Sequence, residues 1–251
     1  MLPLPTLPTT APALDSAQRS ITGPVRPNNE DYLGWAACAG PRGRGWLFAL
    51  ADGVGGAADG EVAARAAVEY LLRQFVAPAA RGGEEAPRAR LGRLVREANH
   101  HVFDLGQGRM ATTLVACCIW GGEAVIAHAG DSRCYLVRDG RARALTRDHL
   151  RRGGSWRPWR PAAPPRLERA LGADLFLTVA LRRLELEPGD VLALTSDGLH
   201  GSVSAGELAR CLAQGPGLEQ AAQALVALAE ARDGSDNISL VLVRIPEASG
   251  A

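Results

Sequence analysis

Residues 46–56 read WLFALADGVGG, an apolar run that ends in Asp52-Gly53 and a cluster of glycines. Aromatic and aliphatic side chains followed by a glycine-rich break are typical of a buried β-strand. A second apolar run at 32–38 precedes this one, and the glycines between 40 and 45 predict that the two strands form a hairpin. Asp52 therefore lies where a buried strand ends, and other aspartates of the chain occupy similar positions.

Groups of strands alternate with pairs of helices along the rest of the chain. Apolar residues recur at helical spacing in 60–76, 90–105, 204–213 and 217–232. In the first helix the predicted buried face consists of Val62, Ala66, Tyr70, Leu71 and Phe75. The runs at 112–120, 123–129, 133–137 and 141–145 predict an antiparallel meander, and further strands are predicted at 177–186, 190–195 and 238–245. This order predicts an α+β fold in which helices cover antiparallel sheets.

Composition limits the classes of protein to which the chain can belong. The 251 residues are 47% hydrophobic, which is enough for one large domain. The formal net charge is only +1, so no nucleic-acid partner is expected. No apolar run approaches the roughly 20 residues that cross a bilayer, so no membrane partner is expected. The five scattered cysteines indicate reduced thiols, and we expect a cytoplasmic monomer with a proline-rich tail at 1–17 and a second tail at 247–251.

Acidic residues gather at the ends of the predicted strands. They occur as Asp52-Gly53, Asp131, Asp197-Gly198 and Asp236-Asn237, with Glu30-Asp31 just before the first strand. Any one of them alone is an ordinary turn residue. Together they would meet at one end of the sheets, where carboxylates repel one another unless cations neutralise them. Oxygen ligands favour Mg²⁺ or Mn²⁺ over zinc, so the sequence predicts a site for hard cations.

Six short motifs carry a resemblance to a known family. They are Arg26-Pro27-Asn28-Asn29-Glu30-Asp31, Ala51-Asp52-Gly53-Val54-Gly55-Gly56, Ala111-Thr112-Thr113, Gly130-Asp131-Ser132-Arg133, Ser196-Asp197-Gly198-Leu199 and Ser235-Asp236-Asn237-Ile238-Ser239. In order and spacing, over about residues 18–246, the chain resembles the metal-dependent serine/threonine protein phosphatases of type 2C in their compact bacterial form. The resemblance implies a four-layer αββα sandwich, with two antiparallel sheets between two pairs of helices.

The resemblance also implies roles for individual residues. Asp52 would bridge two Mn²⁺ or Mg²⁺ ions, Gly53 would offer its carbonyl, and Asp197 and Asp236 would hold one of the ions. Glu30 and Asp31 would orient metal-bound waters or contact the second ion, and Asp131 with Asp197 would hold a weaker third cation. Arg26 matches the family's phosphate-binding arginine, whose planar fork can bind two phosphate oxygens.

The implied chemistry needs no protein nucleophile, because two cations can share a water, lower its pKa and direct it at phosphorus. Many eukaryotic members carry a histidine, proposed as the general acid, where this chain has Val54. Valine cannot donate a proton, so the resemblance implies that a metal-bound water does so. The chain's own histidines are expected to be structural or solvated.

The largest departure from the family pattern is the flap, the segment at 147–169. It is rich in arginine, proline and tryptophan, and its candidate substrate-docking residues are Arg151, Arg152, Trp156, Arg157, Trp159 and Arg160. Exposed tryptophan and arginine are favoured at interfaces. The segment is equally compatible with a solvated loop, so both interpretations stay open.

The expected substrates are phosphorylated proteins, the products of a serine/threonine kinase. Two alternatives remain on the same fold: a pseudophosphatase that only binds phosphoproteins, and a small-molecule phosphohydrolase. The presence of Asp52, Asp197 and Asp236 favours catalysis over a pseudophosphatase. The metal site alone does not separate protein substrates from small ones, because its chemistry acts on the phosphoryl group.

Overall fold

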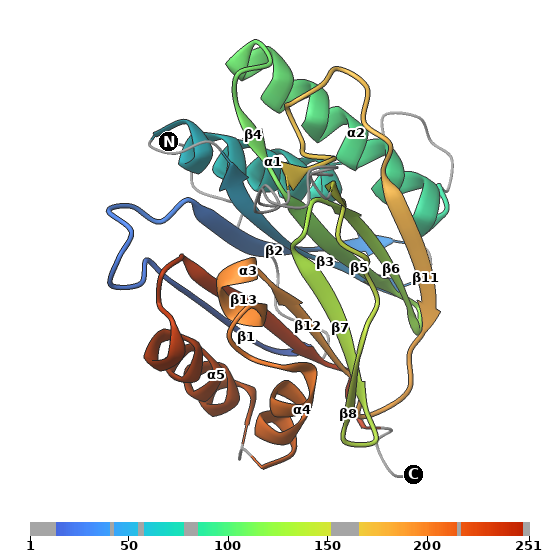
Figure 1. The fold of residues 1–251 in the computed structure, drawn as a ribbon. Helices are drawn as coiled ribbons and strands as arrows, with labels where there is room; N and C mark the ends of the chain where they lie inside the picture. Colours follow the sequence, from blue (N-terminus) through green and yellow to red (C-terminus); the bar gives the residue numbers. More distant parts are fainter. Residues whose placement is uncertain are drawn as a thin grey trace.

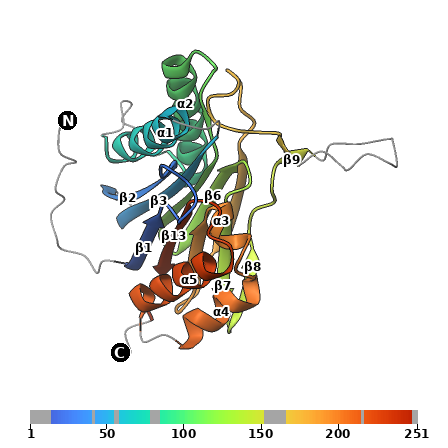
Figure 2. The same cartoon turned by 60° about the vertical axis from the view of Figure 1, so that its left-hand side comes forward.

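The computed structural model describes residues 14–40, 43–54, 58–77, 85–151, 166–214 and 217–247. Within these ranges two antiparallel β-sheets pack face to face, and a pair of helices covers the outer face of each sheet (Figures 1 and 2). The predicted α+β class and its four-layer αββα arrangement are therefore confirmed.

The first sheet contains the predicted hairpin. Its strands run in the order β11-β6-β5-β3-β2, with the short β4 beside β3. Their bounds are Asp31–Gly40 (β2), Gly43–Val54 (β3), Ala111–Thr112 (β4), Leu114–Trp120 (β5), Glu123–Ala129 (β6) and Ala180–Glu185 (β11). The register of the hairpin places Asp31 directly opposite Asp52. Two acidic residues from separate motifs thus become neighbours through backbone pairing alone.

The second sheet has the order β1-β13-β12-β7-β8. Its strands are Asp15–Ile21 (β1), Arg133–Arg138 (β7), Arg141–Ala144 (β8), Val191–Thr195 (β12) and Ile238–Arg244 (β13). The prediction included no strand at β1, and the tail boundary at residue 18 falls inside it. β1 pairs along its full length with β13, but as an edge strand it fully buries only Ala17. A strand with so few buried side chains carries almost no apolar pattern that sequence could reveal.

The predicted meander is wrong, because its four strands are divided between the two sheets. β5 and β6 pair in the first sheet, and β7 and β8 pair in the second. The chain crosses between the sheets at Gly130, which has φ +104° and would place a Cβ only 2.7 Å from the Thr113 side chain. The turn at Glu187-Pro188-Gly189 makes a similar crossing from β11 to β12. A glycine turn between two apolar runs is common to hairpins and crossings, so the sequence did not separate them.

The helices lie where their periodicity predicted. Helices α1 (Ala58–Val76) and α2 (Pro87–Gly106) pack on the first sheet, and α4 (Ala205–Gln214) and α5 (Leu218–Arg232) pack on the second. A further short helix, α3 (Asp197–His200), follows β12. A third apolar layer between the sheets includes Phe48, Leu50, Ile126 and Leu194. This packing fixes the ends of both sheets relative to each other.

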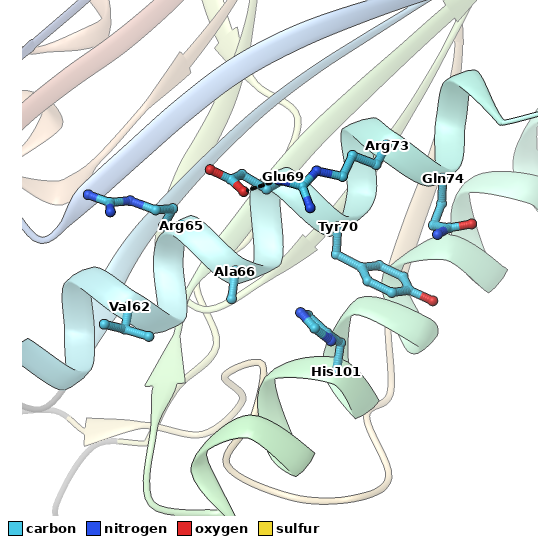
Figure 3. A pocket seen from close by; sticks show the side chains of 8 residues that line it. All are labelled: Val62, Arg65, Ala66, Glu69, Tyr70, Arg73, Gln74 and His101. Atoms are coloured by element: carbon cyan, nitrogen blue, oxygen red, sulfur yellow. Dashed lines mark hydrogen bonds and ion pairs between the residues drawn. The ribbon is translucent and has the colours of Figure 1, made fainter. Parts of the chain in front are cut away.

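The predicted buried face of α1 is partly wrong. Leu71 and Phe75 are buried, but Val62 is 43% exposed, and the helix instead buries Ala63, Ala64, Ala67 and Val68. Val62, Ala66 and Tyr70 face a groove of about 350 Å³ between α1 and α2, where the Tyr70 ring stacks on His101 (Figure 3). The error arises because the small alanines let the helix lie close to the sheet. Larger side chains such as Val62 then lie at the edge of the buried face and not at its centre.

The predicted flap is described only at its two ends. Leu150–Arg151 (β9) pairs with Arg166–Leu167 (β10), and β9 lies to the side of the layered body (Figure 2). Arg151 is exposed in β9. The other candidate docking residues, Arg152, Trp156, Arg157, Trp159 and Arg160, lie outside the described residues.

Over the described ranges, no helix is both long enough and apolar enough to pass through a membrane.

Two valines on α1 test the revised helix face. Val68 is fully buried, so Val68→Ala is expected to lower the free energy of unfolding by about 2 kcal/mol, because it removes two methyl groups from a packed site. The matched change Val62→Ala removes the same atoms from an exposed site and is expected to cost less than about 0.5 kcal/mol. Urea denaturation of both variants measures the difference, and equal losses would contradict the assigned face.

Candidate metal centre

Five aspartates from distant parts of the chain come together at one end of the sheets. Asp31 begins β2, Asp52 lies near the end of β3, Asp131 follows β6, Asp197 begins α3 and Asp236 precedes β13. The pKa of Asp52 is raised well above its ordinary value, first by burial and then by the charges of the other four aspartates. The fold therefore assembles the acidic cluster that the sequence predicted.

Buried hydroxyl groups hold the backbone of Asp52 on both sides. The Asp52 amide donates to the Thr113 hydroxyl at 2.9 Å, and the Thr113 amide donates to the Asp52 carbonyl at 2.8 Å. The Thr112 hydroxyl donates to the same carbonyl at 2.9 Å. The Thr113 and Ser132 hydroxyls lie 2.6 Å apart. Each hydroxyl belongs to one of the quoted motifs, but sequence alone did not show that they position Asp52.

Gly53 lies where no other residue would fit. A Cβ at this position would lie 2.3 Å from the Gly60 carbonyl oxygen, and a Cβ at Gly60 would lie 2.4 Å from a Glu30 carboxylate oxygen. The Gly53 amide donates to the Glu30 carbonyl at 3.1 Å. This close packing brings the start of α1 against the acidic cluster, and it is possible because Gly53 and Gly60 have no side chains.

Three buried carboxylate oxygens have no hydrogen-bond partner within the described residues. They are both oxygens of Asp31 and the Oδ1 atom of Asp197. Leaving a buried carboxylate unpaired is costly, and proteins normally satisfy such oxygens with donors or cations. Carboxylate oxygens are the ligands that hard divalent cations prefer. The unpaired oxygens therefore fit a metal site.

Burial shifts the acid–base behaviour of this cluster. Burial is the main reason that the pKa of Asp31 is raised to about 7; the side chains of Ser239 and Ser196 act to lower this pKa, and the charges of Asp197 and Asp236 act to raise it. Burial, followed by the charge of Asp197, raises the pKa of Asp131 to about 6. The pKa of Asp197 is raised as well, by burial and by Asp236. The surroundings thus disfavour the ionised form of these carboxylates, and a bound cation would stabilise that form.

Arg26 and Asp236 form an ion pair beside the cluster. The Arg26 Nη2 atom lies 2.8 Å from the Asp236 Oδ2 atom, and Arg26 Nε donates to the Ser235 carbonyl at 3.3 Å. Both side chains remain partly exposed. The pKa of Arg26 is raised, chiefly by the charge of Asp236. The guanidinium is therefore held at the mouth of the acidic cluster.

Asn237 fixes the loop that carries Arg26, a role that the sequence analysis missed. Its Oδ1 atom accepts from the Glu30 amide at 2.8 Å, and its Nδ2 atom donates to the carbonyls of Thr22 and Asn28 at 2.8 and 3.0 Å. One buried amide thereby ties both ends of the loop between β1 and β2 to the start of β13. The Ser235-Asp236-Asn237 motif was the only signal, and it did not distinguish a ligand from its support.

The side chains do not yet form a closed ligand set. Over the described ranges, no three histidine, cysteine, aspartate or glutamate side chains are arranged to hold a metal ion as they lie. Asp236 shows one reason, because its carboxylate is turned to the Arg26 guanidinium. The structure nevertheless brings Asp31, Asp52 and Asp197 together with Asp131 and Asp236.

The chain is similar to phosphatases over nearly its whole length. The family model for protein phosphatase 2C matches residues 27–239. The serine/threonine phosphatase stp of Listeria innocua is 31% identical over 238 residues, which cover 90% of this chain and 93% of that relative. The residues matched by the family model include every predicted metal ligand, and this match begins one residue after Arg26.

Solved structures show the same likeness. The serine/threonine phosphatase of S. agalactiae has a TM-score of 0.77 and 28% identity, with 93% of this chain and all of that chain covered. The catalytic domain of the phosphatase PstP, solved in complex with two manganese ions, has a TM-score of 0.74 and 31% identity. That alignment covers 93% of this chain and 99% of the PstP domain.

The raised pKa of Asp31 predicts how the metal-free protein responds to pH. Its folded-state pKa of about 7 lies above the unfolded value near 4, so ionisation disfavours the folded state and stability falls as pH rises through this interval. Asp31→Asn removes the ionisation and is expected to raise the free energy of unfolding at pH 8 by about 1–3 kcal/mol. Urea denaturation in chelator at pH 5 and pH 8 measures the gain, which should shrink at the lower pH. The exposed Asp104→Asn serves as control, and a variant less stable than wild type at pH 8 would contradict the prediction.

Proposed function

The chain belongs to the protein phosphatase 2C family and is a serine/threonine protein phosphatase, and on that premise we propose that Asp52, Gly53, Asp197 and Asp236 hold two Mn²⁺ or Mg²⁺ ions. The observation that carries this assignment is the set of unpaired buried oxygens on Asp31 and Asp197. They lie beside Asp52, whose pKa is raised well above its ordinary value. The two manganese ions in the PstP structure support a count of two. When bound, the ions supply an activated water and stabilise charge on the phosphoryl oxygens.

Asp52 is the central ligand in this proposal because hydrogen bonds hold its backbone amide and its carbonyl. Hydrogen bonds from Thr112 and to and from Thr113 leave it little freedom to move. Preorganised charge stabilises a transition state without reorganisation during the reaction, so a rigid ligand suits the role. Asp197 begins α3, where a hydrogen bond from the Gly198 backbone favours its ionised form. The backbones of both residues are thus fixed before any ion binds.

Arg26 is proposed to bind the phosphoryl group of the substrate. Its planar fork can donate to two phosphate oxygens, and about 45% of its side chain is exposed to an incoming substrate. In the absence of substrate, the ion pair with Asp236 holds the guanidinium beside the acidic cluster. An arginine held by a carboxylate in this way loses less conformational freedom when it binds phosphate.

The remaining acidic residues are assigned supporting roles. Glu30 and Asp31 would orient waters bound to the ions, and the two unpaired oxygens of Asp31 support this. Asp131 is proposed to hold a third cation with Asp197, because the charge of Asp197 acts directly on the pKa of Asp131. Val54 carries no proton donor, so it takes no part in proton transfer.

The proposed substrates are proteins phosphorylated by a serine/threonine kinase. The curated relatives named as serine/threonine protein phosphatases support this class. A panel of phosphothreonine peptides beside inorganic pyrophosphate and sugar phosphates tests it. We expect turnover of the peptides only with added Mn²⁺ or Mg²⁺, and exclusive turnover of small metabolites would contradict a protein substrate.

Replacement of a proposed ligand gives the sharpest test of the centre. Asp197→Asn keeps the shape of the side chain but removes its charge, and is expected to lower kcat/KM by about a hundredfold or more. Mn²⁺ should raise the melting temperature of the wild type but not of this variant, because only a bound ion stabilises the folded state. Asp104→Asn on α2 should behave as wild type in both measurements. Undiminished turnover in Asp197→Asn would end the assignment.

The proposed phosphate contact is tested at Arg26. Arg26→Ala is expected to lower kcat/KM by about ten- to a hundredfold, less than loss of a metal ligand. Arg26→Lys keeps the charge but not the two-pronged geometry, so it should recover only part of the loss. Steady-state kinetics with a small aryl phosphate measure both variants. Full activity in Arg26→Ala, or a large fall in its melting temperature, would show that the residue is structural.

A further inference from the structure

A shallow groove of about 460 Å³ runs between β1, the edge strand of the second sheet, and α5, which packs on that sheet. The two elements lie side by side (Figure 1). Its apolar lining consists of Ile21, Pro24, Val226 and Ala227. Gln223 lines the same groove from α5. The groove is open to solvent along its length, which suits an extended segment of another chain better than a small molecule.

One end of this groove opens beside Arg26. Gly23 has φ +76°, and a Cβ there would lie 2.7 Å from the Asp236 carbonyl oxygen. Pro24 packs against Gly234, because a Cβ on that glycine would lie 3.0 Å from the Pro24 ring. Pro24 is two residues from Arg26, so their Cα atoms are at most about 7 Å apart. The end of the groove that Pro24 lines therefore lies close to the proposed phosphate-binding position.

Charge distinguishes the two ends of the groove. At the far end Arg19 on β1 pairs with Glu219 at the start of α5, so its charge is neutralised. At the near end Glu230 lines the groove, and its backbone carbonyl lies close to Gly234. The exposed Glu230 carboxylate makes no ion pair or side-chain hydrogen bond within the described residues. The end nearest Arg26 thus presents an apolar floor and an uncompensated negative charge.

We propose that this groove binds the stretch of substrate protein next to the phosphorylated residue, with an apolar side chain on the floor and an arginine or lysine beside Glu230. The inference rests on the proposed function, because it uses Arg26 as the phosphate contact. An extended chain rises about 3.3 Å per residue, so the recognised side chains would lie roughly two to four positions from the phosphorylated residue. The groove would then set sequence preference without contributing to the chemistry.

Matched phosphothreonine peptides test the preference directly. One peptide carries leucine and arginine at positions two to four residues from the phosphothreonine, and its partners replace the leucine by serine or the arginine by glutamate. We expect kcat/KM to fall about tenfold for loss of the leucine, the usual range for an apolar side chain in a pocket. Glu230→Arg is expected to reverse the preference between the arginine and glutamate peptides.

Two adjacent residues on α5 supply a variant and its control. Gln223 and Ala224 are both exposed, but only Gln223 lines the groove. In Gln223→Trp the indole would fill the groove, and the ratio of kcat/KM for the leucine peptide to that for a small aryl phosphate is expected to fall about tenfold. Successive side chains on a helix point about 100° apart, so in Ala224→Trp the same indole would lie away from the groove. The ratio for that variant should stay at the wild-type value.

The aryl phosphate separates this inference from the proposed function. A wild type that hydrolyses aryl phosphate but treats all the peptides alike would overturn the groove while leaving the metal-centre assignment in place. Equal ratios in Gln223→Trp and Ala224→Trp would overturn it as well. A wild type that hydrolyses neither substrate with added Mn²⁺ would overturn both.

Discussion

Mutual repulsion among buried carboxylates is the constraint on which this structure depends. Asp31 is buried, Asp52 and Asp197 are half-buried beside it, and two of the three keep oxygens without partners among the described residues. Such an arrangement survives only if the surrounding structure is firm enough to oppose it. Two packed sheets supply that firmness, because each acidic residue leaves from a strand or short helix whose other end is fixed in an apolar layer.

The supports of the cluster are themselves buried and polar, which explains their variety. Threonine hydroxyls hold the Asp52 backbone, an asparagine amide ties the loop of Arg26 to β13, and paired glycines let α1 approach β3. Each support satisfies backbone groups that would otherwise be stranded between the sheets. The site is therefore a property of the whole sheet end, and a change in any support would shift the carboxylates.

The sequence predicted the elements better than their partners. Periodicity located α2, α4 and α5 and the β2–β3 hairpin, because each has a wide apolar face or a clear turn. It did not locate β1, whose side chains are mostly exposed, and it joined β6 to β7 across Gly130 because a crossing between sheets uses the same residues as a hairpin. On α1 small alanines form the buried stripe, so the larger apolar side chains indicated the wrong face.

The acidic residues of the cluster were all predicted, because the residue type itself indicates metal binding. Their supports, such as Thr113 and Asn237, were not, since their roles depend on which strands become neighbours.

Pairing of β1 with β13 also has a consequence for biosynthesis. These strands lie near opposite ends of the chain, and Asn237 at the start of β13 fastens the loop of Arg26. A ribosome that has synthesised only the residues before β13 has therefore produced Arg26 and Asp52. It has not yet produced Asn237, which holds the loop of Arg26 in place. Contacts between segments so far apart form late, because the intervening chain must first be ordered. The nascent polypeptide is consequently expected to stay inert until almost the whole domain has emerged.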